Sequence, residues 1–114
     1  MAATDAPADS APPPQRYIHV LRLVERLHRE EAWTQADKDA VSRHFLYLKE
    51  ATARGQVLLV GRTQEPYERT FGIAIFEAAD ASAAQRFSHN DPAVIAGVMT
   101  CECRPFTVIL ERAR

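Results

Sequence analysis

The chain has 114 residues, of which 46% are hydrophobic and 25% are charged, and its formal net charge is −1. This size and composition are typical of one globular domain with a single core. Binding to nucleic acid or to an anionic membrane usually requires a basic face, so the near-neutral charge argues against both partners. No apolar segment is long enough to span a bilayer, and the N-terminus lacks a secretory pattern, so we expect a cytoplasmic protein.

The first 15 residues differ in composition from the rest of the chain. Residues 1–15 consist mostly of Ala, Pro, Asp and Ser, and three consecutive prolines precede Gln15. Such a segment has almost nothing to bury in a core. The sequence therefore predicts a disordered tail over 1–15 and a folded domain over 16–114.

Strand-like and helix-like segments alternate along the folded part. A first strand is predicted over Arg16–Val24, where β-branched and aromatic residues are frequent. After a polar connection, Thr34 is a plausible N-cap, with Asp37 in the capping-box position and Gly55 as the stop of a long helix. The remaining predicted elements are strands over 56–63 and 71–78, a helix over 81–90, a short helical turn over 93–97 and a strand over 101–110.

The order of these elements is βαββαβ, which is the ferredoxin-like pattern of an α+β domain. It predicts a four-stranded antiparallel sheet with both helices on one face. The last three strands carry apolar residues on both faces, so the open face lacks a cover within the chain. We therefore expect a homodimer packed sheet to sheet. Pro105 indicates an edge strand or a bulge, because proline cannot donate to the ladder.

Cys101 and Cys103 form a C-x-C pattern within the last predicted strand. Alternation places both side chains on one face, at a separation that is awkward for a disulfide. No nearby cluster of His or Cys completes a metal site, and no glycine-rich phosphate loop is present. We expect reduced cysteines that pack as small apolar residues, and a protein without a metal or organic cofactor.

His44 and Asp91 are the main candidates for chemistry. On a helical wheel, the buried stripe consists of Val41, Phe45, Leu48 and Thr52, and His44 lies at its edge. His44 is thus either a boundary residue whose ring nitrogen meets a backbone carbonyl, or a group that reaches a cleft. Asp91 is either only the N-cap of a short helix that begins at Pro92, or it also faces the histidine.

Two longer stretches bear on this choice. The segments "RHFLYLKEATARGQVLLVGR" and "FGIAIFEAADASAAQRFSHNDPAVIAGV" resemble the YciI-like, or YCII-related, proteins of the dimeric α/β-barrel group. The shared features are a helical His followed by Gly eleven residues later, a strand closed by Gly61, a strand of the type "IFEA", and an Asp-Pro that leads to Gly97. The likeness extends over about 16–110, which is nearly the whole domain.

The resemblance implies a site centred on His44 and Asp91, in which the carboxylate fixes the tautomer of the histidine for proton transfer. Related folds include isomerases and dehydrochlorinases that act on small cyclic or halogenated aromatic compounds. Two positions depart from the family pattern. Arg62 replaces a proline and is either an anion-binding cation or a solvated residue at the end of a strand. Ala93 replaces an aromatic residue and suggests a roomier pocket.

Other residues near this site have weaker claims. His19 alternates with Tyr17 and Leu21 on the first strand, and it either lines the same cleft as a substrate-binding residue or is a satisfied buried histidine. Arg62 is the second substrate-binding candidate. His89 is close to Asp91 in sequence, but the end of a helix favours an exposed position.

Three functions remain open from the sequence. The first is a cofactor-independent lyase or isomerase that uses His44 as acid/base and Asp91 as its orienting carboxylate, on a small-molecule substrate. The second is a ligand-binding or accessory module with the same cleft and no turnover. The third is a structural subunit of a larger assembly.

Overall fold

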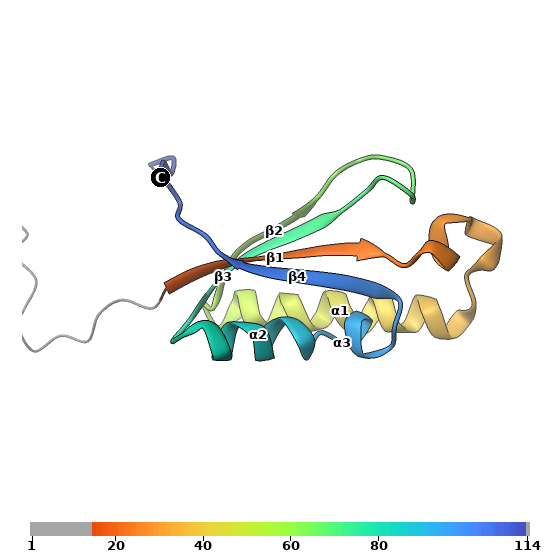
Figure 1. Ribbon diagram of the computed structural model, residues 1–114, viewed down its shortest axis with the longest axis horizontal. Helices are drawn as coiled ribbons and strands as arrows, with labels where there is room; N and C mark the ends of the chain where they lie inside the picture. The colour runs from red at the N-terminus through yellow and green to blue at the C-terminus, as the bar shows by residue number, and fades with distance from the viewer. Residues whose placement is uncertain (1–14, 114) are drawn as a thin grey trace, which may run out of the picture.

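The computed structural model describes residues 15–113 and shows one antiparallel sheet with helices on one side (Figure 1). Its elements, in chain order, are β1 (Gln15–Leu23), the 3-10 helices η2 (Glu25–His28) and η3 (Glu30–Ala32), α1 (Gln35–Ala53), β2 (Val57–Arg62), β3 (Gly72–Ala78), α2 (Ala81–His89), α3 (Pro92–Ile95) and β4 (Met99–Pro105). The predicted tail lies outside the described residues except for Gln15, which is the first residue of β1.

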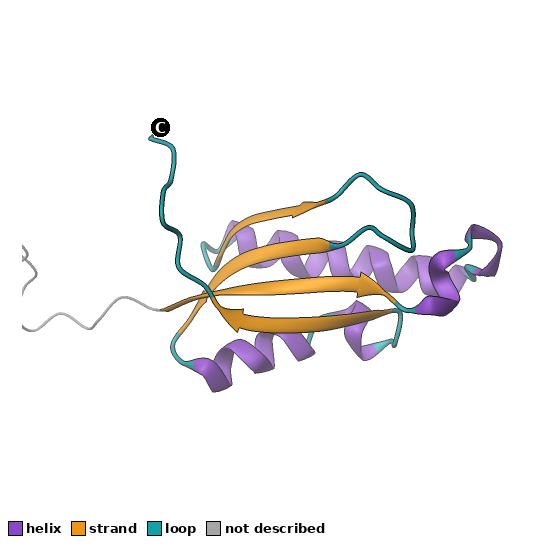
Figure 2. Cartoon of the chain, turned by 45° about the horizontal axis from the view of Figure 1, so that its top comes forward, coloured by secondary structure: helices purple, strands orange, loops and turns teal. Residues whose placement is uncertain are grey.

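The four strands are arranged in the order β2-β3-β1-β4, and all neighbouring pairs are antiparallel. The helices α1, α2 and α3 lie against one face of this sheet, and the other face has no helix over it (Figure 2). This is the predicted α+β, ferredoxin-like βαββαβ fold. Within residues 15–113, no helix is long and apolar enough to cross a membrane.

The long helix α1 begins at a complete capping box. The Asp37 backbone N–H donates to Thr34 Oγ1 at 3.2 Å, and the Thr34 backbone N–H donates to Asp37 Oδ2 at 2.9 Å. Arg26 also donates to both carboxylate oxygens of Asp37, each at 2.9 Å. This guanidinium, together with the Thr34 donors, holds the pKa of Asp37 well below its usual range. The capping box predicted from Thr34 and Asp37 is therefore confirmed, and Arg26 ties the connection before α1 to it.

The core lies between the sheet and the helices. Its largest cluster combines residues of β1, β3, α1 and α2, including Tyr17, Phe76, Leu48 and Phe87. A second cluster around Leu27 lies beneath the 3-10 segment, which the sequence indicated only as a polar connection. Leu27 is fully buried, and its burial fixes the chain between β1 and α1.

The prediction of a strand over 101–110 is wrong for residues 106–110. β4 begins earlier, at Met99, and ends at Pro105 on the edge of the sheet, as proline requires. Residues 106–110 have high β propensity, but beyond the Phe106 N–H, which donates to the Arg16 carbonyl at 2.9 Å, they form no strand with the described residues. Ile109 and Leu110 remain 80% and 90% exposed.

The open face of the sheet is apolar only in its centre. Ile18 pairs with Ile75, and Val20 pairs with Ile73, all on the side opposite to the buried His19. An irregularity between Val57 and Leu59 turns Leu59 to the open face. On β4, alternation places Thr100, Glu102 and Arg104 there, so the expectation of an apolar open side for this strand is wrong.

We expect the Thr34→Ala variant to lower the free energy of unfolding by about 0.5–2 kcal/mol, because the Asp37 N–H loses its acceptor. Urea denaturation at neutral pH, followed by circular dichroism, measures the change. Thr34→Ser keeps the hydroxyl and serves as the matched control, with a smaller loss. Equal losses in the two variants would show that the hydroxyl does not stabilise α1.

Candidate functional site

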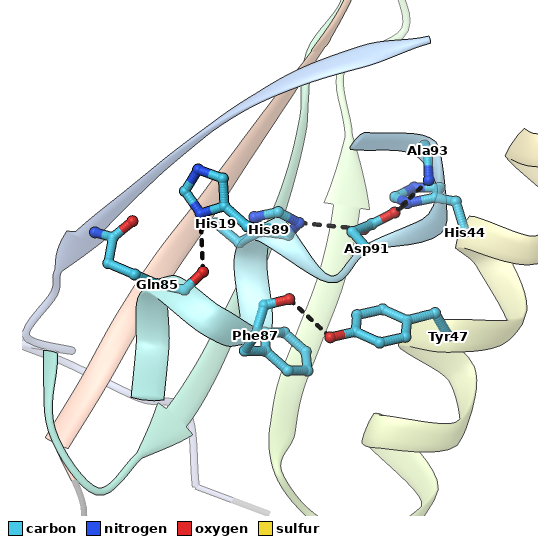
Figure 3. Close-up of polar contacts among 8 residues, drawn as sticks. All are labelled: His19, His44, Tyr47, Gln85, Phe87, His89, Asp91 and Ala93. Atoms are coloured by element: carbon cyan, nitrogen blue, oxygen red, sulfur yellow. Dashed lines mark hydrogen bonds and ion pairs between the residues drawn. The ribbon is translucent and has the colours of Figure 1, made fainter. Parts of the chain in front are cut away.

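Asp91 occupies the junction between α2 and α3 and is fully buried. It is the N-cap of α3, and its Oδ1 accepts from the Ala93 backbone N–H at 2.9 Å. Pro92 is the first residue of that helix, and Gly97, at φ +75°, closes the turn in the left-handed region. These local constraints fix the backbone at Asp91, so that its carboxylate points toward His19 and His44 in the interior (Figure 3).

The side chain of His44, which comes from α1, also contacts the Asp91 carboxylate (Figure 3). Its Nδ1 lies 2.8 Å from both Oδ1 and Oδ2 of Asp91. The His44 side chain is 14% exposed, whereas the Asp91 side chain is not exposed at all. The structure therefore brings together the two residues that the sequence singled out, although they are 47 positions apart.

His19 is a second histidine on the same carboxylate. Its Nε2 lies 3.2 Å from Asp91 Oδ2, and its ring is completely buried. The sequence placed His19 in the cleft or in the core, but it did not identify Asp91 as its partner. The only local signal was its alternation with Tyr17 and Leu21, which all face the helices and are buried.

Three donors from three parts of the chain thus converge on Asp91: His19 from β1, His44 from α1 and the Ala93 N–H of α3. Burial alone would raise the pKa of Asp91, but these hydrogen bonds and the charge of His44 outweigh it and lower the pKa to about 2. The carboxylate is therefore ionised at neutral pH.

Tyr47 of α1 lies near the Asp91 carboxylate, and its hydroxyl donates to the Phe87 carbonyl at 2.7 Å (Figure 3). Burial and the nearby charge of Asp91 raise the pKa of Tyr47 to about 12. Its hydroxyl is therefore protonated at neutral pH and serves to tie α1 to α2. The Tyr47 ring also stacks on Phe87, with 5.1 Å between the ring centroids.

A cavity of about 510 Å³ lies between α1 and the β2–β3 hairpin. Its wall is mainly apolar, and the apolar side chains on the helix-facing side include Leu21, Val41, Phe45, Leu48, Val60 and Met99. Trp33 and Tyr67 also line it and pack against each other, with 5.6 Å between the ring centroids. The ionisable residues along the wall are His44, Arg62, Glu65 and Tyr67. Among the described residues, no group of three or more His, Cys, Asp or Glu is arranged to hold a metal ion.

The cavity explains one error in the helical wheel. The wheel places Phe45 in the buried stripe, but this side chain is 61% exposed because it borders the open space. Thr52, which the wheel also places there, is exposed, and its hydroxyl donates to the Leu48 carbonyl at 2.8 Å. Arg62 lines the cavity from the end of β2, on the same side of the sheet as Leu21 and Gly72. The sequence had left open whether it was a strand-end residue or faced a ligand.

The structure corrects the expectations for His19 and Ala93, and it agrees with the exposed position expected for His89. His19 is not part of the cavity wall, because it lies in the core on the far side of the carboxylate from His44. Ala93 is fully buried against Leu27 and Val98, so its small size does not enlarge the cavity. His89 is exposed and its Nδ1 lies 2.9 Å from the Gln85 carbonyl, away from Asp91.

The two cysteines are free and half-buried on the helix-facing side of β4. Burial raises the pKa of both thiols, and the charge of Asp91 adds to this effect at Cys101. Neither cysteine lines the cavity. They pack as the sequence suggested.

Comparison with known families gives one match. The family described as YCII-related domain matches residues 20–107, which include β1 from Val20 onward, all three α-helices and β4. The matched range contains His44, Arg62 and Asp91 and leaves out His19 by one position. No curated protein matches the chain.

The lowered pKa of Asp91 predicts a specific loss of stability in acid. Because the folded state keeps the carboxylate ionised down to about pH 2, whereas its ordinary pKa is 3.8, the stabilisation is present above pH 3.8 and is lost as the pH falls toward 2. The loss should reach about 2 kcal/mol. Denaturant melts of the wild type and of Asp91→Asn across this range should converge as the pH falls. A constant difference between them would contradict the ionised buried carboxylate.

Proposed function

This chain belongs to the YCII-related family, and on that premise we propose that it is a small-molecule enzyme in which His44 exchanges a proton with the substrate. Asp91 orients the His44 ring and stabilises its charged form. The observation that carries the proposal is the His44–Asp91 pair at 2.8 Å, with His44 in the wall of a cavity. A histidine that is oriented by a carboxylate and borders a cavity can act as a general acid or base on a bound substrate.

The chemistry follows from the ionised carboxylate. Because Asp91 can only accept hydrogen bonds, Nδ1 of His44 must carry a proton. In the neutral ring this leaves the lone pair on Nε2, which has no hydrogen-bond partner among the described residues. Nε2 can therefore take a proton from a substrate in the cavity and return it at another atom, while the carboxylate balances the imidazolium.

The cavity suggests what kind of substrate would fit. Its apolar and aromatic wall favours a compact, largely apolar compound, and Arg62 provides a cation for an anionic group. A proton removed from carbon next to a carbonyl group would lead to isomerisation, and with a leaving group on the adjacent carbon it would lead to elimination. The related folds of the YciI-like family include isomerases and dehydrochlorinases, which supports both reaction types.

Deuterium exchange tests this proposal even while the product is unidentified. The protein is incubated in D₂O with a panel of small cyclic and aromatic carbonyl acids, and exchange at carbon is followed by NMR. We expect His44→Ala to lower the exchange rate by about 10² to 10⁴, which is the usual contribution of a general base. His89→Ala is the matched control, because His89 is exposed and outside the cavity.

Two results would count against an enzyme. Unchanged exchange in His44→Ala would exclude His44 as the proton carrier. Binding of a panel compound without exchange in the wild type, and loss of that binding in Arg62→Ala, would favour a ligand-binding module on the same cavity instead.

We also propose that two copies pack through the open faces of their sheets. Ile18, Val20, Ile73 and Leu59 form an apolar, partly exposed centre on that face around Ile75, which is already buried. It is bordered by charges of both signs, among them Arg22, Glu102 and Arg104, so a twofold arrangement can place opposite charges together. The chain end with Ile109 and Leu110 projects on the same side and adds exposed apolar surface (Figure 1).

Sedimentation velocity tests this assembly. The wild type should sediment as a dimer, and Val20→Glu should sediment as a monomer because it buries a charge in the centre of the interface. Leu46→Glu is the control, since Leu46 is 52% exposed on α1, away from the sheet face. A monomeric wild type, or a dimer that Val20→Glu leaves intact, would contradict the proposal.

A further inference from the structure

Asp91 has two histidine partners, and only one of them lines the cavity. We propose that His19 is a positioning residue, which holds the Asp91 carboxylate in the orientation that His44 needs, with its own proton fixed on Nε2. The inference rests on the proposed function for its catalytic consequence. The tautomer and the contact that it assigns are properties of the protein without substrate.

The hydrogen-bonding capacity of the ring determines its tautomer. Nε2 of His19 lies 3.2 Å from Asp91 Oδ2, and an ionised carboxylate can only accept, so Nε2 must donate. Nδ1 of His19 is buried and has no partner among the described residues. A proton on Nδ1 would therefore be a buried N–H without an acceptor, which costs more than an unused lone pair. The neutral ring with its proton on Nε2 is therefore favoured, because it satisfies the N–H donor and leaves only an unused lone pair on Nδ1.

The surroundings of His19 leave its ring little freedom. β1 is a central strand, and His19 pairs with Ala74 of β3 on one side and with Cys103 of β4 on the other. Phe76 and Phe87 meet the His19 ring edge to face, with 6.5 Å and 6.3 Å between the centroids. A side chain that is packed in this way can act as a fixed donor.

The contacts of the carboxylate explain why a second donor matters. Oδ1 accepts from the Ala93 N–H and Oδ2 accepts from His19, so the two oxygens are held at opposite ends. His44 Nδ1 then lies 2.8 Å from each of them and donates between the two. Without His19, the Ala93 N–H would be the only donor other than His44 itself that limits rotation of the carboxylate about its Cβ–Cγ bond. The geometry of His44 depends on that rotation.

His19 and His44 thus have different roles, although they share a residue type and an acceptor. His44 has one nitrogen on Asp91 and borders the cavity, so its other nitrogen can exchange a proton with a ligand. His19 has no exposure and no access to the cavity. It contacts neither substrate nor reacting atom, and its effect passes through Asp91.

The tautomer is tested directly by ¹⁵N NMR of the histidine rings in the full chain at mildly alkaline pH. We expect His19 to show a protonated Nε2 and an unprotonated Nδ1. The reverse pattern, or a mixture of both tautomers, would overturn the inference. This measurement needs no substrate and no variant.

Two substitutions test the positioning role. Gln can place its amide N–H near the position of Nε2, whereas Leu removes the donor at similar volume. We expect the Nδ1 proton signal of His44 to persist in His19→Gln and to broaden or disappear in His19→Leu. In the exchange assay, kcat should fall about tenfold to a hundredfold in His19→Leu with little change in KM, because a misplaced base slows the proton step. His19→Gln should recover most of that loss.

A control separates this effect from general damage to the core. Tyr17→Phe alters another buried polar residue on the same face of β1, two positions earlier, whose hydroxyl donates to Gln15 and not to Asp91. It should leave the His44 signal unchanged. Equal effects of His19→Leu and Tyr17→Phe would reduce His19 to a packing residue. Absence of exchange in the wild type would refute the enzyme and leave the NMR result intact, so the two failures are distinguishable.

Discussion

The ionised carboxylate of Asp91 is the constraint around which the interior is organised. A charge in a site without solvent exposure is costly unless hydrogen bonds replace its lost water. Here the replacements come from β1, α1 and the first turn of α3, which are far apart in the sequence. Each of these elements must be in its native place for the carboxylate to be satisfied. A single side chain therefore links the sheet, the long helix and the turn after α2, and the resulting site is a product of the whole fold.

Much of the fold follows from local patterns in the sequence. The alternation of strand-like and helix-like segments, the cap at Thr34 and the stop at Gly55 suffice to predict βαββαβ, and the structure agrees. The exceptions arise where tertiary context decides. Residues 106–110 have the composition of a strand, but within residues 15–113 no strand continues beside them. Phe45 has the spacing of a core residue, but it borders a cavity that no local pattern can reveal.

The candidate site was predictable to a similar extent. Asp91 directly precedes Pro92 and has a clear capping signal, and His44 lies at the edge of a buried stripe, so both residues stand out in the sequence alone. That the two residues pair could be predicted only from the family resemblance, because a helical wheel says nothing about contacts between residues 47 positions apart. The role of His19 was beyond reach, because alternation on β1 shows only that a side chain points inward. The group it meets is 72 positions away, on a turn.

The ionisable residues in the cavity wall come from two segments that differ in burial. His44 comes from α1 and depends on buried neighbours, whereas Arg62, Glu65 and Tyr67 come from the end of the β2–β3 hairpin and are largely exposed. Side chains on an exposed hairpin tolerate replacement far better than a satisfied core network does. Substitutions at the hairpin tip can therefore change the shape and charge of the cavity while the buried network of His19, Asp91 and His44 stays the same.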